Sequence, residues 1–288
     1  METGDFRQLT IDGEVCRVAA GTPLKDACLL AGKEIPTLCW HERLTPASTC
    51  RACVVELEGS RTLVSACSRL VEEGMVVHTD SPRVLHARRG IAELLLSVVE
   101  DAQVPELQEL VQSTGADVAH FRFGATLAQP TRDDNDLYIR DYSQCILCYR
   151  CVEACGEDAQ NTFAIHVAGR GFGAHIDTGF DRSLVDSDCV FCGNCVQVCP
   201  TGALMDKTEW TLRQTGEWDE SCIQVSETTC SYCGVGCALD LHVLNQRIVK
   251  VTSPYSHPVT QGMLCVKGRY GYEYVQRPDT SSVHSSAP

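Results

Sequence analysis

The chain has 288 residues, of which 19 are cysteine, and its formal net charge is −14. This length usually corresponds to about two domains, but bound metal lets small modules fold around little apolar core, so we expect more than two. The strong negative charge argues against nucleic acid and against anionic membrane surfaces as partners.

Neither a secretory signal nor a membrane span is visible in the sequence. The first seven residues contain no apolar run, and a signal peptide requires one. The longest apolar candidate, residues 91–99, contains Glu93 and is shorter than the roughly 18 residues that would suggest a span. Many cysteines in a chain that is not secreted indicate a reducing compartment and metal ligation. We therefore expect a cytoplasmic protein without direct membrane insertion.

Residues 1–80 predict a small module around a two-iron site. Residues 9–15 predict two strands about an Asp12-Gly13 turn, and Thr22-Pro23 predicts the start of a helix that ends before Gly32. Two irons need four thiolates, most of them on one loop, and plant-type ferredoxins supply them with a shorter first interval. The spacing C-x10-C-x2-C-x13-C therefore predicts a [2Fe–2S] site, with structural zinc as the alternative. Its ligands would be Cys39, Cys50, Cys53 and Cys67.

Three further side chains near this site are not expected to be ligands. Cys16 on a strand and Cys28 on the helix are interpreted as small buried apolar residues. His41 lies two residues after Cys39, but four cysteines already complete the site.

The long first interval resembles that of the N-terminal [2Fe–2S] domain in the large iron–sulfur subunit of complex I and in NAD-linked formate dehydrogenases and hydrogenases. In those families the next segment usually carries a cluster held by one histidine and three cysteines, spaced H-x3-C-x2-C-x5-C. Here no cysteine lies between Cys67 and Cys145. We therefore predict that this cluster is missing and that His86 and His120 are not ligands.

The segment at residues 81–138 is expected to form a helical linker. Ser81-Pro82 predicts the start of one helix, and a second is expected after Pro105 and to end near Gly115. The three aspartates within residues 131–136 indicate a solvated connection.

The spacing C-x2-C-x2-C-x3-C then occurs twice, at residues 145–155 and 189–199. Three cysteines at intervals of three wrap a loop around one corner of a cubane, and the fourth is carried on the next helical turn to the other cluster. Zinc needs two pairs of ligands rather than two runs of four, so it and disulfides are disfavoured. Proline follows Cys199 in the second run, whereas Gly156 follows Cys155 in the first. The assignment is unaffected, because the residue at this position shapes the exit turn and is not a ligand. We predict two [4Fe–4S] centres, the first held by Cys145, Cys148, Cys151 and Cys199 and the second by Cys155, Cys189, Cys192 and Cys195.

Between these runs, residues 163–176 predict a small hairpin packed over the clusters. Its glycines are not spaced as a dinucleotide-binding loop and no helix follows, so nucleotide binding is disfavoured. Small residues there are expected to let backbone N–H groups approach cluster sulfurs, which raises the reduction potential.

The last cysteine group has the spacing C-x2-C-x3-C-x27-C and predicts a further [4Fe–4S] centre. Its ligands would be Cys230, Cys233, Cys237 and Cys265. A connector with two tryptophans precedes this group, and a hairpin turning at Asn245 lies within it. The group resembles the N-terminal [4Fe–4S] domain of molybdopterin oxidoreductases, especially formate dehydrogenase. The resemblance implies that Lys267, two places after Cys265, lies near the cluster or near a pterin of a partner. Cys222 stays unassigned.

Taken together, the motifs resemble the N-terminal iron–sulfur arm of the formate dehydrogenase large subunit over nearly the whole chain. We expect this chain to lack the catalytic molybdopterin domain of that family, and we expect its end to be a disordered tail. The expected fold class is α+β, with a β-grasp [2Fe–2S] ferredoxin-like domain, a helical linker, a bacterial-type 2[4Fe–4S] ferredoxin domain and a small β-rich [4Fe–4S] domain. The expected boundaries are residues 1–80, 81–138, 139–207, 208–278 and 279–288.

Three functions are compatible with one [2Fe–2S] and three [4Fe–4S] clusters. The favoured hypothesis is an electron-transfer subunit of a multi-subunit NAD-linked oxidoreductase, of the formate dehydrogenase, hydrogenase or flavin-based bifurcating type. Its partners would be a flavin/NADH-binding subunit and a further redox subunit, in a hetero-oligomer without a substrate-converting site on this chain. The alternatives are the iron–sulfur arm of a split molybdenum or tungsten bis-pterin enzyme, and a redox sensor or cluster carrier.

Overall fold

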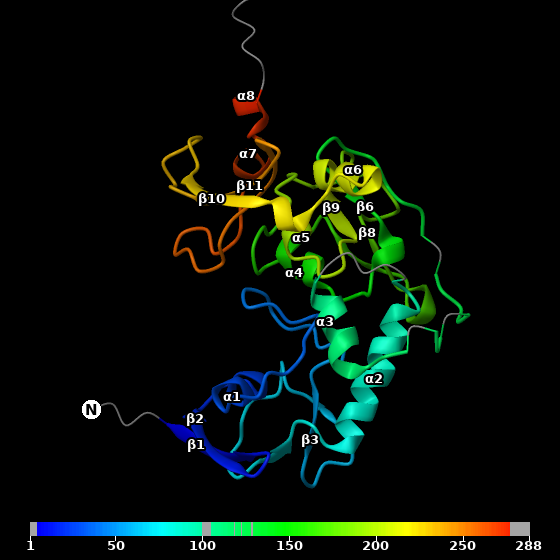
Figure 1. Ribbon diagram of the computed structural model, residues 1–288, viewed down its shortest axis with the longest axis vertical. Coiled ribbons are helices and arrows are strands. Elements are labelled where there is room, and N and C mark those ends of the chain that lie inside the picture. Colours follow the sequence, from blue (N-terminus) through cyan, green and yellow to red (C-terminus); the bar gives the residue numbers. More distant parts are fainter. Residues whose placement is uncertain (1–4, 100–104, 118, 122, 128, 277–288) are drawn as a thin grey trace, which may run out of the picture.

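The computed structural model describes residues 5–99, 105–117, 119–121, 123–127 and 129–276. The N-terminal sheet lies at one end of the long axis, and the C-terminal sheet and helices lie towards the other end (Figure 1). The expected tail at residues 279–288 falls outside the described residues. Among the described helices, none combines the length and apolar character needed to cross a bilayer.

The N-terminal module is a five-stranded mixed sheet with one helix. The strands lie in the order β2-β1-β5-β3-β4, with β1 and β5 parallel and the other neighbours antiparallel. The predicted hairpin forms because Asp12 and Gly13 both adopt positive φ, 47° and 87°. The predicted helix begins directly after Pro23. The elements are β1 (Phe6–Ile11), β2 (Glu14–Ala19), α1 (Leu24–Leu30), β3 (Val54–Leu57), β4 (Val64–Ser65) and β5 (Val76–His78).

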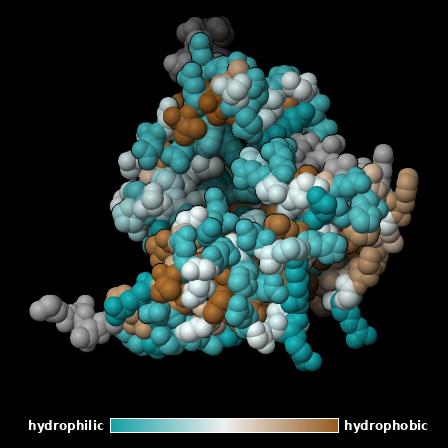
Figure 2. Space-filling model, turned by 60° about the horizontal axis from the view of Figure 1, so that its bottom comes forward, coloured by the Kyte–Doolittle hydropathy of each residue, from teal (hydrophilic) through white to brown (hydrophobic). Residues whose placement is uncertain are grey.

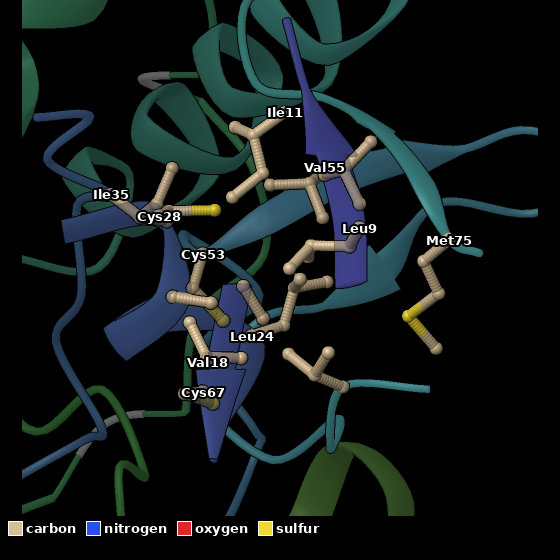
Figure 3. Packing of buried hydrophobic residues seen from close by; sticks show 14 residues of the cluster. Leu9, Ile11, Val18, Leu24, Cys28, Ile35, Cys53, Val55, Cys67 and Met75 are labelled. Atoms are coloured by element: carbon tan, nitrogen blue, oxygen red, sulfur yellow. The ribbon is translucent and has the colours of Figure 1, made fainter. Parts of the chain in front are cut away.

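One apolar core joins this sheet to α1. Leu9 and Val55 point towards Leu24 from the strands, and Cys53 and Cys67 border the same core (Figure 3). Cys28 is fully buried there, and burial raises the pKa of its thiol to about 11. Cys28 therefore stays protonated and packs as a small apolar side chain, whereas Cys16 is only partly buried against the same core.

Two helices follow the sheet, as the sequence predicts. α2 (Pro82–Leu96) begins at Ser81, whose hydroxyl accepts a hydrogen bond from the Val84 N–H at 3.3 Å. α3 (Pro105–Thr114) packs against α2. The buried Arg88 of α2 donates to the carbonyl of Val54 at 2.8 Å, which ties the helix to the sheet.

The connection at residues 131–136 differs from the solvated linker that its aspartates suggested. Asp134 forms an ion pair with Arg140, which is fully buried, and its carboxylate also accepts from the Leu184 N–H at 2.9 Å. Asp133 pairs with Lys207 at 2.5 Å. Asp133 and Asp136 are exposed as expected, but Asp134 is half-buried because its charge is matched by the buried Arg140.

The central module contains the two cysteine runs. The strands β6 and β9 pair antiparallel, and β7 and β8 form the predicted hairpin. Two short helices pack together: α4 carries Cys151 and Cys155, and α5 carries Cys195 and ends two residues before Cys199. The elements are β6 (Tyr138–Arg140), α4 (Arg150–Cys155), β7 (His166–Ala168), β8 (His175–Asp177), α5 (Asn194–Gln197) and β9 (Leu204–Asp206).

The C-terminal module is a three-stranded antiparallel sheet in the order β10-β11-β12. Its hairpin turning at Asn245 is as predicted, but the strand β10 and the helix in the tryptophan-containing connector are not evident from the sequence pattern. The elements are α6 (Lys207–Thr215), β10 (Gln224–Thr229), β11 (Ala238–Leu244), β12 (Arg247–Thr252), α7 (Val266–Tyr270) and α8 (Glu273–Gln276).

Candidate metal centres

The four cysteines of the predicted [2Fe–2S] site come together on the loop before β3 and directly after β4. All four are buried. Thiol hydrogen bonds join Cys39 to Cys50 and Cys67, and Cys67 to Cys53. The bonds from Cys50 and Cys67 lower the pKa of Cys39, while the same contacts and burial raise the pKa of Cys50 and Cys67. Four buried thiols gathered in this way form a donor set that suits a positively charged metal core.

His41 lies beside this site but faces elsewhere. Its ring packs edge-on against Tyr255, with centroids 4.5 Å apart, and its Nδ1 accepts from the Arg43 N–H at 3.2 Å. Burial, with Arg150 and Arg43 nearby, lowers the pKa of His41 to about 4. The neutral ring therefore acts as a packing side chain between modules.

Four cysteines of the central module line one cavity. Cys145, Cys148 and Cys151 of the first run surround it together with Cys199 from the end of the second run. Ile176 of the β7–β8 hairpin lines the same cavity, so the hairpin covers this site. Burial and the neighbouring thiols Cys148, Cys145 and Cys199 raise the pKa of Cys151 well above its usual value.

The other four cysteines form the matching group. Burial raises the pKa of Cys195, and the thiols of Cys192, Cys189 and Cys155 raise it further. Cys155 thus lies with the second run although it ends the first. The structure brings together the cysteines that the spacing assigned to each centre, with the fourth member exchanged between runs.

The two runs repeat one backbone conformation. Leu147 and Phe191 adopt positive φ, 52° and 55°, and their N–H groups each donate to the sulfur two residues earlier at 3.4 Å. Tyr149 and Gly193 adopt φ of 66° and 71° and precede the two helices. Cysteine sulfurs thus accept from four backbone N–H groups of these loops, those of Leu147, Arg150, Phe191 and Asn194. The donors that the sequence suggested, the hairpin glycines, make no such bond in the described part of the chain.

The last group is the most open of the four. Cys230 is buried and Cys237 half-buried, whereas Cys233 and Cys265 are exposed. Burial raises the pKa of Cys237, and Cys230, Cys233 and Cys265 add to that effect. Lys267 is exposed on α7, two residues after Cys265.

The predicted absence of a histidine-ligated cluster concerns His86 and His120. His120 contacts the buried carboxylate of Glu93 at 2.7 Å and stacks on Phe121, and His86 is exposed on α2. Within the described ranges, no three His, Cys, Asp or Glu side chains are arranged to share a single metal ion. A polynuclear cluster instead spreads its thiolates over separate irons.

Sequence reasoning missed the residues that hold the sites against each other. Arg269 and Asn194 connect the last group to the second cysteine run, and Arg150 donates to the carbonyl of Trp40 at 2.7 Å. Their only signal in the sequence is their position inside the cysteine motifs (Arg150 and Asn194) or just after one (Arg269), which does not indicate their partners.

Three family models match separate segments of the chain. A 2Fe-2S iron-sulfur cluster binding domain matches residues 8–82, a 4Fe-4S dicluster domain matches residues 143–203, and a molybdopterin oxidoreductase Fe4S4 domain matches residues 223–277.

Several characterised proteins are similar over most of the chain. The NADPH-Fe(3+) oxidoreductase subunit alpha of Geobacter sulfurreducens is 36% identical, over 94% of this chain and 32% of that protein. One subunit of an NADH-quinone oxidoreductase of Rhizobium meliloti is 33% identical, over 94% of this chain and 32% of that protein. The NADP-reducing hydrogenase subunit HndD of Solidesulfovibrio fructosivorans is 39% identical, over 69% of this chain and 36% of that protein. The chain thus spans about a third of the length of these relatives.

The fold is also similar to a chain in a crystal structure of an NAD+-reducing [NiFe]-hydrogenase in the H2-reduced state. The TM-score is 0.63 at 27% sequence identity, covering 70% of this chain and 87% of the other. Together with the three domain matches, this likeness shows an α+β multi-module iron–sulfur protein that combines a [2Fe–2S] domain, a dicluster [4Fe–4S] domain and a molybdopterin-oxidoreductase-type [4Fe–4S] domain.

Proposed function

We propose that this chain is an electron-transfer subunit of a multi-subunit NAD(P)-linked oxidoreductase. The observation that carries the proposal is the succession of cysteine groups through the fold. Cys39, Cys50 and Cys148 belong to one apolar cluster, so the first site lies beside the second. Cys151 and Cys195 belong to another and influence each other electrostatically. Iron–sulfur clusters bound at these groups would supply single-electron transfer between neighbouring sites.

The proposed inventory is one [2Fe–2S] and three [4Fe–4S] clusters. The thiolates hold the irons, and burial with backbone N–H donors tunes each site. The proposed ligand sets are Cys39, Cys50, Cys53 and Cys67; Cys145, Cys148, Cys151 and Cys199; Cys155, Cys189, Cys192 and Cys195; and Cys230, Cys233, Cys237 and Cys265. The domain boundaries given by the sequence remain a prediction.

We further propose that the partners are a flavin/NADH-binding subunit and another redox subunit. The names of the relatives, which are NAD(P)H-linked oxidoreductase or hydrogenase subunits, support this. At the N-terminal end, Leu29, Leu30 and Leu70 are exposed, and Figure 2 shows apolar patches among hydrophilic side chains on that end. Apolar patches on a protein surface are typical of interaction sites. Formate dehydrogenase, hydrogenase and flavin-based bifurcating assemblies are the candidate complexes.

A second candidate is the iron–sulfur arm of a molybdenum or tungsten bis-pterin enzyme. The match to a molybdopterin oxidoreductase Fe4S4 domain at residues 223–277 favours it, as does the exposure of Cys233, Cys265 and Lys267 on one module. Lys267 would then face a pterin held by other protein domains. Analysis of the native complex for molybdenum and tungsten separates the two candidates. If neither metal is present, the second candidate is excluded.

Anaerobic purification of the chain with metal analysis and EPR tests the first proposal. The expected result is about 14 irons per chain, with signals of one [2Fe–2S] and three [4Fe–4S] centres, and no oxidation of formate or hydrogen by the chain itself. Zinc in place of iron, or turnover of formate or hydrogen by the isolated chain, would contradict it.

A further inference from the structure

One buried arginine connects the C-terminal module to the central module. Arg269 lies on α7, four residues after Cys265, and only 1% of its surface is exposed. Its Nε donates to the carbonyl of Cys192 at 2.8 Å, and its Nη1 donates to the carbonyl of Val251 on β12 at 3.1 Å. One guanidinium therefore holds the second cysteine run of the central module against the sheet of the C-terminal module.

Asn194, on the same loop as Cys192, makes the second part of this connection. Its amide oxygen accepts from Nη2 of Arg269 at 3.0 Å and from the N–H of Leu264 at 3.0 Å. Leu264 directly precedes Cys265, and Asn194 directly precedes Cys195. The segment that carries Cys265 is thus fastened on both sides to the loop that carries Cys192 and Cys195.

The loop is shaped to admit the arginine. Gly193 adopts φ of +71°, and a Cβ atom there would lie 2.4 Å from Cδ of Arg269 and 2.4 Å from the hydroxyl oxygen of Tyr270. The positive charge consequently sits against the backbone of the second run, beside Cys192. A fixed positive charge stabilises added negative charge at a neighbouring site, most strongly when water is excluded.

We propose that Arg269 is a positioning residue that couples the centre of Cys155, Cys189, Cys192 and Cys195 to the centre of Cys230, Cys233, Cys237 and Cys265. It fixes their separation through Cys192 and Asn194, and its charge favours the reduced form of the centre at Cys192. The transfer it serves moves one electron, which one centre loses and the other gains, with no bond made or broken. This inference rests on the proposed function, because it requires iron–sulfur clusters at both groups.

The test compares variants of the full chain, purified anaerobically with their clusters. Arg269→Gln removes the charge, Arg269→Lys keeps the charge but not the planar fork of donors, and Arg247→Gln is the control, an exposed arginine of the same module. The readouts are iron per chain, the midpoint potential of each centre from an EPR-monitored titration, and the magnetic broadening between reduced centres. Cys192→Ala and Cys233→Ala identify the two signals.

In Arg269→Gln we expect a more negative midpoint potential for the centre at Cys192 and weaker broadening with the centre at Cys233. In Arg269→Lys we expect the potential to return towards the wild-type value while the broadening stays weak. Arg247→Gln should change neither.

Unchanged potential and broadening in an iron-complete Arg269→Gln variant would overturn the inference, as would equal shifts in Arg247→Gln. If Arg269→Gln loses one of the two centres, Arg269→Lys decides, because wild-type broadening in that variant contradicts the positioning role. If the wild-type chain contains no iron, that result would instead contradict the proposed function.

Discussion

Cys155 and Cys199 each end one cysteine run and lie with the thiols of the other run. The exchange follows from local geometry, because α4 and α5 each start after a left-handed residue and lead the chain away from the preceding loop, with Cys155 at the end of α4 and Cys199 two residues after α5. The two helices pack together, so each fourth cysteine arrives at its neighbour's site. In the proposed ligand sets, the two centres would therefore depend on each other for their ligands.

Cys199→Ser is expected to disrupt the centre at Cys145, Cys148 and Cys151 and to leave the second centre assembled. Metal analysis should show a loss of up to about four irons per chain, and EPR should identify the missing signal. The matched control is Cys222→Ser, which changes an exposed cysteine outside all four groups. This variant should keep the full wild-type iron content. Loss of the second centre's signal instead would contradict the exchanged pairing.

Gly193→Ala and Gly171→Ala separate a steric clash from backbone strain. Both glycines have positive φ, but a Cβ at Gly171 would meet nothing within 4 Å, whereas one at Gly193 would meet Arg269 and Tyr270. Alanine at Gly171 should cost about 1–2 kcal/mol from the left-handed backbone, and alanine at Gly193 about 1–3 kcal/mol more from overpacking. Thermal midpoints of the iron-loaded variants, followed by visible absorbance, measure the difference. Equal midpoints would show that Arg269 moves aside freely.

At the scale of elements, α6 is held to the C-terminal sheet by a buried charge network. Glu209 accepts from Lys250 of β12 at 2.7 Å and from Arg213 at 2.8 Å. Burial acts to raise the pKa of Glu209, but Lys250 and Arg213 together bring it below its usual value. Burial acts to lower the pKa of Lys250, but Glu209 and Asp206 together raise it. The network thus explains how a helix forms in the connector between two modules.

Glu209→Gln should destabilise the protein by about 2–4 kcal/mol, because it leaves the half-buried Lys250 without its main partner. Lys250→Met should cost less, about 1–3 kcal/mol, since Glu209 keeps Arg213. Thermal midpoints at neutral pH measure both, with the exposed Glu217→Gln as control, expected to stay within about 0.5 kcal/mol. Equal effects of all three substitutions would contradict a stabilising network.

The pH dependence of this network follows from the two shifts. Glu209 has a lowered pKa, so its contribution is complete above about pH 5 and is lost as the pH falls through its folded value. Lys250 has a raised pKa, so its contribution is complete below about pH 10 and is lost as the pH rises through its folded value. The midpoint difference between wild type and Lys250→Met should therefore be constant near neutral pH and shrink in strong alkali.

At the scale of the whole molecule, residues 40–45 dock the N-terminal module onto the other two. The carbonyl of Trp40 accepts from Arg150, Arg43 donates to the carbonyl of Tyr255 at 2.6 Å, and Thr45 donates through its N–H to Asp158 at 2.5 Å. This loop directly follows Cys39, so the same contacts set the distance between the first and second sites. In the proposed function, electron transfer between modules would require this docking to persist.

Asp158→Ala should loosen the docking without touching a cysteine. Asp158 accepts from both the N–H and the hydroxyl of Thr45, so its loss should speed hydrogen exchange of residues 40–45 by about tenfold, the equivalent of about 1.4 kcal/mol. Glu157→Ala, the exposed neighbouring carboxylate, is the control and should leave exchange unchanged. Equal protection in both variants would show that Arg150 and Arg43 suffice.

The sequence by itself determined the local features of this protein. The Asp12-Gly13 hairpin, the helix start at Ser81 and the four cysteine groups each depend on residues close in the chain, where turn preferences, caps and ligand spacing are visible as patterns. Even the exchange of Cys155 and Cys199 follows from a spacing.

Tertiary structure alone decided how the modules meet. Arg269 reaches Cys192 across 77 residues and Arg150 reaches Trp40 across 110, and no periodicity marks such partners. Likewise, the sequence indicates that Asp134 is a solvated charge, whereas the structure pairs it with the buried Arg140. The strand β10 and helix α6 escaped prediction because their stability comes from neighbouring strands and from Lys250 rather than from their own sequence. These contacts depend on packing between distant segments, which residue spacing does not encode.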